Sequence, residues 1–329
     1  MKLSVAIPLF NEAESLPPLI AELRTVLQTL DCDYEILFVN DGSEDETLAI
    51  LTREASADPR IKVLSLSRNF GHQVALTAAL DFSSGDAVVI MDGDLQDPPE
   101  LLPEMIRLYR DGYDIVSPQR ISRQGDSWLK RRTASLFYWL INKLTESQIS
   151  PEVGDFRLLS RRAVLALRQF REQRRFVRGL VGWMGLRETL LPFHRRARRA
   201  GSTKYPWTKM ARLSWVAITS LSSLPLRLSI VAGFFASGIA VLYFLYAGYA
   251  KFVKKDVVQG WTSIVFLQCF FFGMTLLCLG ILGQYIAHIY EEARSRPLYV
   301  LSGSMNIDAD AARVARAIVL GPPEGCDDR

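Results

Sequence analysis

The sequence predicts an α/β protein, in which a mostly parallel, Rossmann-like sheet domain precedes juxtamembrane amphipathic helices and two transmembrane helices. Three observations support this prediction. Short apolar runs alternate with helical patterns in the first half of the 329 residues, basic helical patterns with tryptophan follow, and the last third has two long runs without Asp, Glu, Lys or Arg. The uncharged runs exclude a protein that is water-soluble throughout.

Five runs in the first half are predicted to form strands of one sheet. They cover residues 3–9, 34–39, 61–66, 87–91 and 114–117, and helical patterns lie at residues 15–29, 46–56, 73–82 and 101–109. The runs are almost continuously apolar, as expected when helices cover both faces of a parallel sheet. Ligands of such sheets bind beyond the carboxyl ends of the strands, so the polar residues that follow the strands are the candidates for a site.

Carboxylates and turn-forming residues follow three of these strands, at residues 10–12, 40–43 and 92–99. Each segment alone is typical of a turn with a helix cap, but three of them at one sheet edge favour a binding site. Neither G-x-G-x-x-G nor G-x-x-x-x-G-K-[ST] follows a strand, so a bound phosphate needs another countercharge. Asp92 and Asp94, with Gly93 between them, predict a Mg²⁺ or Mn²⁺ site that leaves coordination positions for a substrate.

Charge and cysteine spacing exclude several other classes of protein. The 39 Lys and Arg against 35 Asp and Glu give a formal net charge of +4, which does not indicate nucleic-acid binding. The four cysteines form no C-x-x-C pair, so neither a disulfide framework nor a zinc site is supported. Proline interrupts the short apolar run at residues 1–8, which we interpret as a first strand rather than a signal peptide.

The two uncharged runs predict two transmembrane helices. Residues 228–250 are long enough to cross the hydrocarbon core, and the second span is placed at residues 262–285. Basic residues are more numerous outside the two spans than in the loop between them, which predicts a multi-pass protein of the inner membrane with its large domain in the cytoplasm. Basic helical patterns at residues 126–144 and 205–221 are expected at the membrane surface; alternatively, their apolar faces pack on the sheet.

These predictions divide the chain into four parts. They are a cytoplasmic sheet domain at residues 1–204, interfacial amphipathic helices at 205–227, a transmembrane hairpin at 228–290 and a cytoplasmic tail at 291–329. The tail from Ser302 onward is expected to form at most a short helix before it becomes disordered.

Four motifs resemble those of family 2 glycosyltransferases with the GT-A fold. They are V-A-I-P-L-F-N-E from Val5, V-N-D-G-S from Val39, S-R-N-F-G from Ser67 and M-D-G-D-L-Q-D-P-P-E from Met91. Within that family, G-D-F-R-L-L from Gly154 and residues 290–299 resemble the bacterial polyprenyl-phosphate glycosyltransferases with two spans, which are relatives of bactoprenol glucosyltransferases and of dolichyl-phosphate mannose synthase. The resemblance covers residues 1–301 and does not select one sugar.

The resemblance implies which residues bind the donor. The nucleotide sugar is expected to contact Pro8, Glu12, Asp41, Asp92 and Gly93. Asp94 and Gln96 are expected to hold Mg²⁺ or Mn²⁺, whose charge neutralises the diphosphate leaving group, so Asp94 counts as a catalytic residue. Lys204, in a segment G-S-T-K-Y, is expected to reach the diphosphate when that segment closes; alternatively, it is a basic membrane anchor.

The acceptor implied by the resemblance is a lipid phosphate, which needs positioning more than a strong base because it is already ionised. The basic residues expected to hold it are Arg120, Arg123, Lys130 and Arg131. Asp155 is assigned to the catalytic set, as an acid that orients the acceptor or assists as a base, and Arg157 is considered as its ion-pair partner. His72 is left out of the catalytic set, because a lone histidine at a helix start is more often a cap contact.

The resemblance thus implies inverting transfer of a hexose, expected to be glucose, from a UDP-sugar to membrane polyprenyl phosphate. Three alternatives remain open. The first two are other donors, GDP-mannose or a UDP-aminoarabinose derivative. The third is a processive polysaccharide synthase, which should carry an acceptor motif Q-x-x-R-W, whereas Gln173 begins Q-R-R-F. A non-catalytic scaffold is disfavoured by the intact carboxylates. Relatives with two spans often assemble, so a homo-oligomer is also implied.

Overall fold

The computed structural model describes residues 1–121, 153–173, 175–193, 224–249, 253 and 260–307. The chain divides into two compact units. One consists of Met1–Lys204 with Arg296–Arg329, and the other is Tyr205–Ser295. The first is called the sheet unit below.

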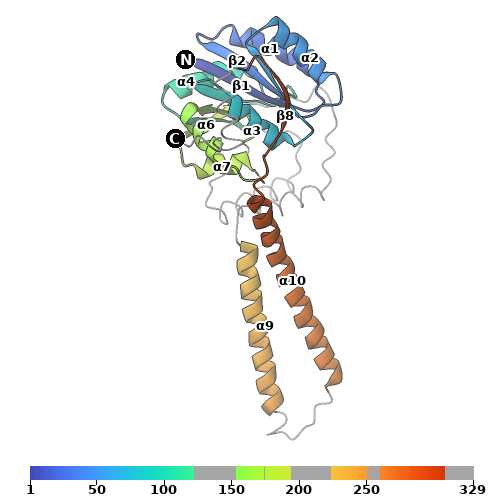
Figure 1. Cartoon of the computed structure of the whole chain (residues 1–329). Coiled ribbons are helices and arrows are strands. Elements are labelled where there is room, and N and C mark those ends of the chain that lie inside the picture. The colour runs from blue at the N-terminus through green and yellow to red at the C-terminus, as the bar shows by residue number, and fades with distance from the viewer. Residues whose placement is uncertain (122–152, 174, 194–223, 250–252, 254–259, 308–329) are drawn as a thin grey trace, which may run out of the picture. The chain divides into compact units, whose positions relative to one another are not determined.

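The first unit contains one sheet of eight strands in the order β7-β5-β6-β4-β1-β2-β3-β8 (Figure 1). The strands are β1 (Lys2–Leu9), β2 (Asp33–Asn40), β3 (Ile61–Leu66), β4 (Ala87–Ile90), β5 (Ile115–Arg120), β6 (Arg157–Ser160), β7 (Glu188–Phe193) and β8 (Leu301–Met305). The central strands β4, β1, β2 and β3 are parallel to their neighbours in that group. Strands β6 and β8 pair antiparallel with β4 and β3. The sheet is therefore mixed but mostly parallel, as the sequence predicted.

Helices cover both faces of the sheet. They are α1 (Leu16–Leu27), α2 (Thr47–Ala57), α3 (His72–Phe82), α4 (Leu102–Arg110), α6 (Arg161–Gln169) and α7 (Val177–Trp183), with a short 3-10 helix η1 (Pro99–Leu101) before α4. Residues alternate along β1, so that Val5 and Ile7 join the core under α1, α2 and α4, whereas Ala6 joins the core under α3, α6 and α7. Burial on both faces explains why the strands are continuously apolar.

Pro8 lies in the central strand β1 although proline cannot donate a ladder hydrogen bond. The register with β4 ends at Ala6, which pairs with Ile90, whereas the register with β2 continues through Pro8 and Val39 to Leu9. Pro8 therefore has a strand neighbour on one side only. The missing amide hydrogen interrupts no pairing with β4, and the strand can carry a proline just before the site edge.

The five strands and four helices predicted in the first half are all present, with small differences at their ends. Strands β6, β7 and β8 were not predicted. The expectation that the chain from Ser302 forms at most a short helix is wrong, because residues up to Met305 form β8, antiparallel to β3. Side-chain bonds stabilise this polar strand, since Ser302 Oγ donates to the carbonyls of Ser65 (3.1 Å) and Leu66 (3.3 Å).

The second unit contains two long apolar helices, α9 (Leu224–Tyr249) and α10 (Trp261–Ala293), which form a hairpin (Figure 1). Each includes a window that could cross a membrane: Leu228–Tyr246 with mean hydropathy 2.2 and Phe270–Ala293 with mean hydropathy 1.8. Neither window is buried inside the protein. Both windows overlap the predicted spans and indicate that the protein is membrane-associated. The basic patterns at 126–144 and 205–221 lie outside the described residues.

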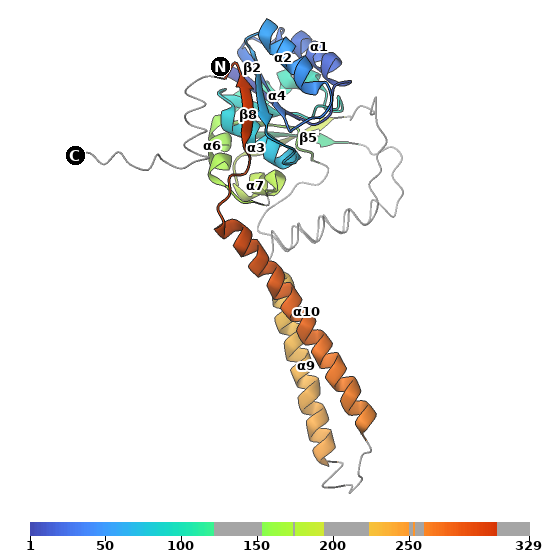
Figure 2. The same ribbon diagram turned by 45° about the vertical axis from the view of Figure 1, so that its right-hand side comes forward.

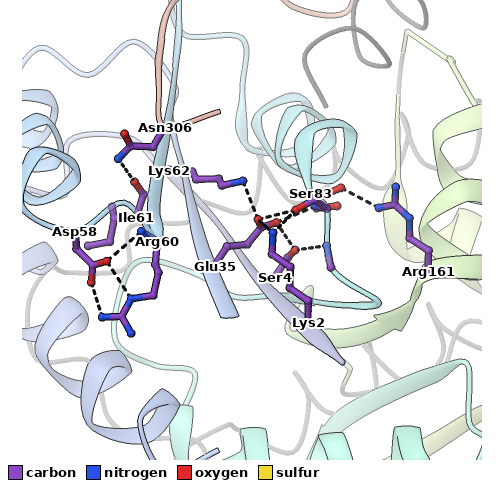
Figure 3. A network of polar contacts seen from close by, with 12 residues as sticks. Lys2, Ser4, Glu35, Asp58, Arg60, Ile61, Lys62, Ser83, Arg161 and Asn306 are labelled. Carbon is purple, nitrogen blue, oxygen red and sulfur yellow. Dashed lines mark hydrogen bonds and ion pairs between the residues drawn. The ribbon is translucent and has the colours of Figure 1, made fainter. Parts of the chain in front are cut away.

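A buried charge cluster lies at the amino-terminal ends of β1, β2 and β3 (Figure 3). The carboxylate of Glu35 is 2% exposed and lies 2.7 Å from Lys2 Nζ and 2.9 Å from Lys62 Nζ. Ser4 Oγ and the Ser84 amide donate to Glu35 Oε1 at 2.5 Å and 2.8 Å. Burial alone would raise the pKa of Glu35, but hydrogen bonds from Lys2, Ser4 and Ser84 outweigh it and lower the pKa to about 2.

We expect Glu35→Gln to destabilise the sheet unit by about 3 kcal/mol at pH 7, because a lowered pKa measures how strongly the folded state favours the ionised form. In the parent protein this contribution is complete above the ordinary value of 4.5 and is lost as the pH falls towards about 2. Denaturation of the detergent-solubilised chain, followed by circular dichroism, should show this slope in the parent and not in the variant. The matched control is Glu35→Gln with Lys62→Met, which also removes the buried ammonium beside position 35 and should restore much of the loss. A Glu35→Gln variant as stable as the parent would contradict the assignment.

Candidate active site

Asp41 follows β2 and connects the ends of three strands. Its amide donates to the carbonyl of Leu9 at the end of β1 (2.8 Å). Its carboxylate accepts hydrogen bonds from the amides of Phe70 (2.7 Å) and Gly71 (2.9 Å), in the loop between β3 and α3. Burial raises the pKa of Asp41 and exceeds the opposing effect of these two amides. Asp41 thus fixes the loop that leads into α3.

Gly42 allows this loop to approach Asp41 closely. Its φ of 67° lies in the left-handed region, and a β-carbon built there would lie 2.4 Å from the backbone carbonyl carbon of Arg68. Any larger residue would push the two loops apart. The G of the N-D-G-S motif is therefore required by the contact between the loops after β2 and β3.

Glu12 lies between the end of β1 and the start of α1. Its amide donates to Thr47 Oγ1 (3.0 Å), and its carboxylate accepts from Ser15 Oγ (2.5 Å). The preceding Asn11 has a φ of 55° and accepts a hydrogen bond from the Glu44 amide through its side-chain oxygen (2.8 Å). The N-E pair thus holds the loop after β1 against the loop after β2.

The turn after β4 carries Asp92, Gly93, Asp94 and Gln96. The Gln96 amide donates to Asp94 Oδ1 (3.1 Å), and Leu95 between them adopts a φ of 60°, a conformation that branched or bulky residues rarely take. A β-carbon on Gly93 would lie 2.3 Å from a methyl group of Leu9, so glycine lets this turn pack against β1. The turn therefore presents its polar side chains in a constrained arrangement.

Two buried oxygens in this turn have no hydrogen-bond partner among the described residues, Asp92 Oδ1 and Gln96 Oε1. Buried acceptors without partners are rare and indicate a missing donor or cation. Asp94 and Gln96 supply oxygen ligands, which Mg²⁺ and Mn²⁺ prefer. No group of three His, Cys, Asp or Glu in the described part of the chain could hold a metal by itself. The donor set therefore fits a cation that takes its remaining ligands from a bound substrate.

His72, the first residue of α3, lies between two carboxylates. Its Nε2 atom is 3.6 Å from Asp92 Oδ1 and 3.4 Å from Asp155 Oδ2. Burial would lower the pKa of His72, but the hydrogen bond with Asp155 and the charges of Asp92 and Asp155 outweigh it and raise the pKa. Burial raises the pKa of Asp92. His72, whose protonated form the two carboxylates favour, therefore connects the turn after β4 with Asp155.

Asp155 is held by three side chains. Arg178 on α7 donates to both of its oxygens, at 2.7 Å and 3.0 Å, and Gln73 Nε2 lies 3.2 Å from Oδ2. Burial would raise the pKa of Asp155, but hydrogen bonds from His72 and Arg178 outweigh it and hold the pKa well below its usual range. Arg157 donates instead to the carbonyl of Gly154 (2.8 Å), so the hydrogen-bonded partner of Asp155 is Arg178 rather than Arg157.

Arg120, at the end of β5, lies beside the segment that carries Asp155. A β-carbon built on Gly154 would lie 3.1 Å from Arg120 Nη2, so glycine leaves space for this guanidinium. The structure thus brings one predicted basic residue next to the Asp155 segment. The other four predicted basic residues, Arg123, Lys130, Arg131 and Lys204, lie outside the described residues.

Three residues of this site were not predicted from the sequence: His72, Gln73 and Arg178. His72 was considered and excluded, but its contacts with Asp92 and Asp155 place it inside the site. Gln73 bridges Asp155 and the amide of Val177, to which its Oε1 atom is bonded at 3.0 Å. Gln73 and Arg178 belong to no recognisable sequence motif. They lie on α3 and α7, which are far apart in the sequence and meet only in the folded unit.

Comparisons with known proteins identify the family of this chain. The model of the family "Glycosyl transferase family 2" matches residues 4–167. An "Uncharacterized glycosyltransferase YkcC" of Bacillus subtilis (strain 168) is 42% identical over 305 residues, which cover 93% of this chain and 94% of that protein. The chain belongs to glycosyl transferase family 2. It is therefore a glycosyltransferase, and its mostly parallel sheet unit is GT-A-like, which confirms the predicted fold class.

One further relative and one solved structure are also similar to this chain. A "Bactoprenol glucosyl transferase" of Shigella phage SfII is 38% identical over 304 residues, covering 92% of this chain and 98% of that protein. Among solved structures, glucosyl-3-phosphoglycerate synthase from Mycobacterium tuberculosis, in complex with Mn²⁺, UDP-glucose and phosphoglyceric acid, is 20% identical with a TM-score of 0.45, covering 66% of this chain and 77% of that one.

Proposed function

We propose that this glycosyltransferase transfers glucose from UDP-glucose to the phosphate of a membrane polyprenol, with inversion at the sugar. The main support is the 38% identity to bactoprenol glucosyl transferases over nearly their whole length. The carboxylates at the sheet edge and the two candidate membrane spans agree with a donor site and a lipid acceptor. The proposed product is a polyprenyl phosphate that carries a single glucose.

On this proposal the donor lies across the ends of β1, β2 and β4. Glu12, Asp41 and Asp92 receive hydrogen bonds from the base and ribose, with Pro8 and Gly93 beside them, because carboxylate oxygens accept from ring N–H groups and hydroxyls. The buried Oδ1 atom of Asp92 accepts no hydrogen bond from the described residues, which supports this role, since a bound ribose or base would supply a donor. Lys204 is proposed to approach the diphosphate.

Asp94 and Gln96 are proposed to hold Mg²⁺ or Mn²⁺. When bound, the cation supplies Lewis-acid stabilisation of the departing UDP. The Gln96 Oε1 atom, buried without a hydrogen-bond partner among the described residues, supports this assignment. Asp94 contributes its charge, and the left-handed backbone at Leu95 presents both side chains from one short turn.

The acceptor phosphate is proposed to attack the anomeric carbon from the side of Asp155. The new bond joins a phosphate oxygen to C1, while the bond from C1 to the UDP oxygen breaks and its electron pair leaves with UDP. Asp155 has a lowered pKa and accepts two hydrogen bonds from Arg178. It therefore orients Arg178 and His72 rather than taking a proton. Arg120, Arg123, Lys130 and Arg131 are proposed to bind the acceptor phosphate.

We also propose a cellular location for the protein. The protein would lie in the inner membrane with its sheet unit in the cytoplasm, where nucleotide sugars are made. The excess of Lys and Arg outside the two spans supports this orientation. Cysteine labelling of membrane-embedded protein, with an impermeant reagent added from either side, would check it at an introduced residue in the sheet unit.

The test of the reaction is a donor panel. Purified full-length protein receives polyprenyl phosphate, a divalent metal and one radiolabelled nucleotide sugar at a time, and label in the lipid phase is measured. Label from UDP-glucose alone supports the proposal. Label from GDP-mannose or a UDP-aminoarabinose derivative instead would overturn the sugar, product longer than one hexose would indicate a processive synthase, and no binding of any donor would indicate a scaffold.

A further inference from the structure

Residues 296–306, which we call the C-terminal strap, leave α10 and return across the sheet unit (Figure 2). Three of their contacts lie before β8. The Arg296 carbonyl accepts from Gln173 Nε2 (2.6 Å), Tyr299 OH donates to Asp81 Oδ2 (2.8 Å), and the Val300 carbonyl accepts from the Ser67 amide (2.9 Å). The strap is thus bonded into the unit that carries the site.

Two of these contacts lie at the two ends of one stretch of chain, residues 67–82, which we call the site segment. Ser67 is its first residue, and Asp81 is the penultimate residue of α3. Between them lie the Phe70 and Gly71 amides that bind Asp41, and the His72 and Gln73 side chains that contact Asp155. The strap therefore holds both ends of the segment whose middle supplies the donor and acceptor sides of the site.

The contact at the far end of α3 is buried and charged. Tyr299 is 2% exposed and Asp81 is 1% exposed. Arg171 also binds Asp81 through both oxygens, at 2.8 Å and 2.9 Å. Buried hydrogen bonds to a charged group are strong and directional, since an unmatched charge is costly at low dielectric. The Tyr299 hydroxyl, together with Arg171 and Arg168, therefore holds the end of α3 in place.

The other half of the strap is bonded away from the site segment. Asn306 Nδ2 donates to the carbonyls of Ala55 (2.7 Å) and Ile61 (2.9 Å), at the turn between α2 and β3. This residue shares the strap with Tyr299 and makes two bonds of similar length, and both go to residues outside the site segment and the proposed site. A substitution of Asn306 therefore loosens the strap without releasing α3, and serves as a control for a substitution of Tyr299.

We propose that Tyr299 is a positioning residue: it holds α3 so that the Phe70 and Gly71 amides meet Asp41 while His72 and Gln73 meet Asp155. The strap follows the second candidate span directly, so this residue ties the donor loop to the chain that leaves the membrane helix. The kinetic consequence rests on the proposed function. The structural consequence is that the Phe70 and Gly71 amides are held against Asp41, and this does not depend on the proposed function.

The variant Tyr299→Phe keeps the buried ring and removes the hydroxyl. In full-length protein in detergent, without substrate, hydrogen exchange of residues 67–73 should become about tenfold faster, as expected for loss of one hydrogen bond to a charged group. The dissociation constant of UDP in the presence of Mn²⁺ should rise by about tenfold. Should Tyr299→Phe fail to fold, Asp81→Asn, which weakens this contact together with the Arg171 ion pair, is measured in the same way.

Asn306→Ala is the matched control. It should lower the thermal midpoint about as much as Tyr299→Phe, but leave exchange at residues 67–73 and UDP affinity within about twofold of the parent. Unchanged exchange there in Tyr299→Phe, or equal changes in both variants, overturns the proposal. If the parent binds no UDP, the proposed function fails, and the exchange comparison still decides the role of Tyr299.

Discussion

Asp94→Ala is expected to reduce sugar transfer to lipid phosphate by about a thousandfold, equivalent to about 4 kcal/mol of transition-state stabilisation. The reason is that Asp94 is the charged ligand proposed for the divalent cation, and the departing diphosphate is then left unscreened. Transfer is measured as label entering the lipid phase at saturating donor. The protein should still enter membranes, because α9 and α10 are unaffected.

The matched control for Asp94→Ala is Glu104→Ala. Glu104 is an exposed acid on α4, ten residues after Asp94, and its carboxylate pairs with Arg107 at 2.6 Å. Its loss should leave transfer within about twofold, since exposed ion pairs contribute little. Binding of UDP should respond to added Mn²⁺ in the parent and in Glu104→Ala, but not in Asp94→Ala. Parent-like turnover in Asp94→Ala would remove the metal proposal.

Asp155→Asn is expected to lower turnover by about a hundredfold while UDP binding stays within about threefold of the parent. The amide keeps the shape of the side chain but loses the charge that orders Arg178 and His72, so the acceptor side of the site is disordered and the donor side is largely kept. Turnover at saturating donor and equilibrium binding of UDP measure the two effects separately. Lost UDP binding would place Asp155 at the nucleotide instead.

The lowered pKa of Asp155 adds a pH test. Because hydrogen bonds from His72 and Arg178 hold the pKa below the ordinary value of 3.8, the carboxylate stays ionised in any neutral or mildly acidic assay. Parent turnover should therefore show no loss from protonation of Asp155 as the pH falls to about 5. Arg178→Lys keeps the charge but removes the two-pronged contact, so it should show an intermediate defect.

The first half of the fold could be predicted because its strands are buried on both faces. Val5, Ala6 and Ile7 are all apolar, since alternate residues enter different cores. Strand β8 has no such pattern: it reads L-S-G-S-M and is formed by pairing with β3 and by the Ser302 hydroxyl. Such a strand depends on a partner distant in sequence, and local periodicity does not reveal it.

The position of Asp41 and Asp92 at one sheet edge was predictable for a related reason. Asp41 and Asp92 directly follow parallel strands, and the carboxyl ends of those strands must meet at one edge. His72 was discounted because its position at a helix start has an ordinary explanation. Its importance comes from Asp92 and Asp155, which lie 20 and 83 residues further along the chain and approach it only in the folded sheet.

The strand that finishes the sheet edge is synthesised after both hydrophobic helices. While the ribosome is still making those helices, β3 has an open edge with unpaired amides and carbonyls, which is a template for aggregation. Folding of the sheet unit can therefore be completed only after the hairpin has been synthesised. A soluble fragment cut before the first span should precipitate, whereas one with residues 296–306 spliced onto its end should not.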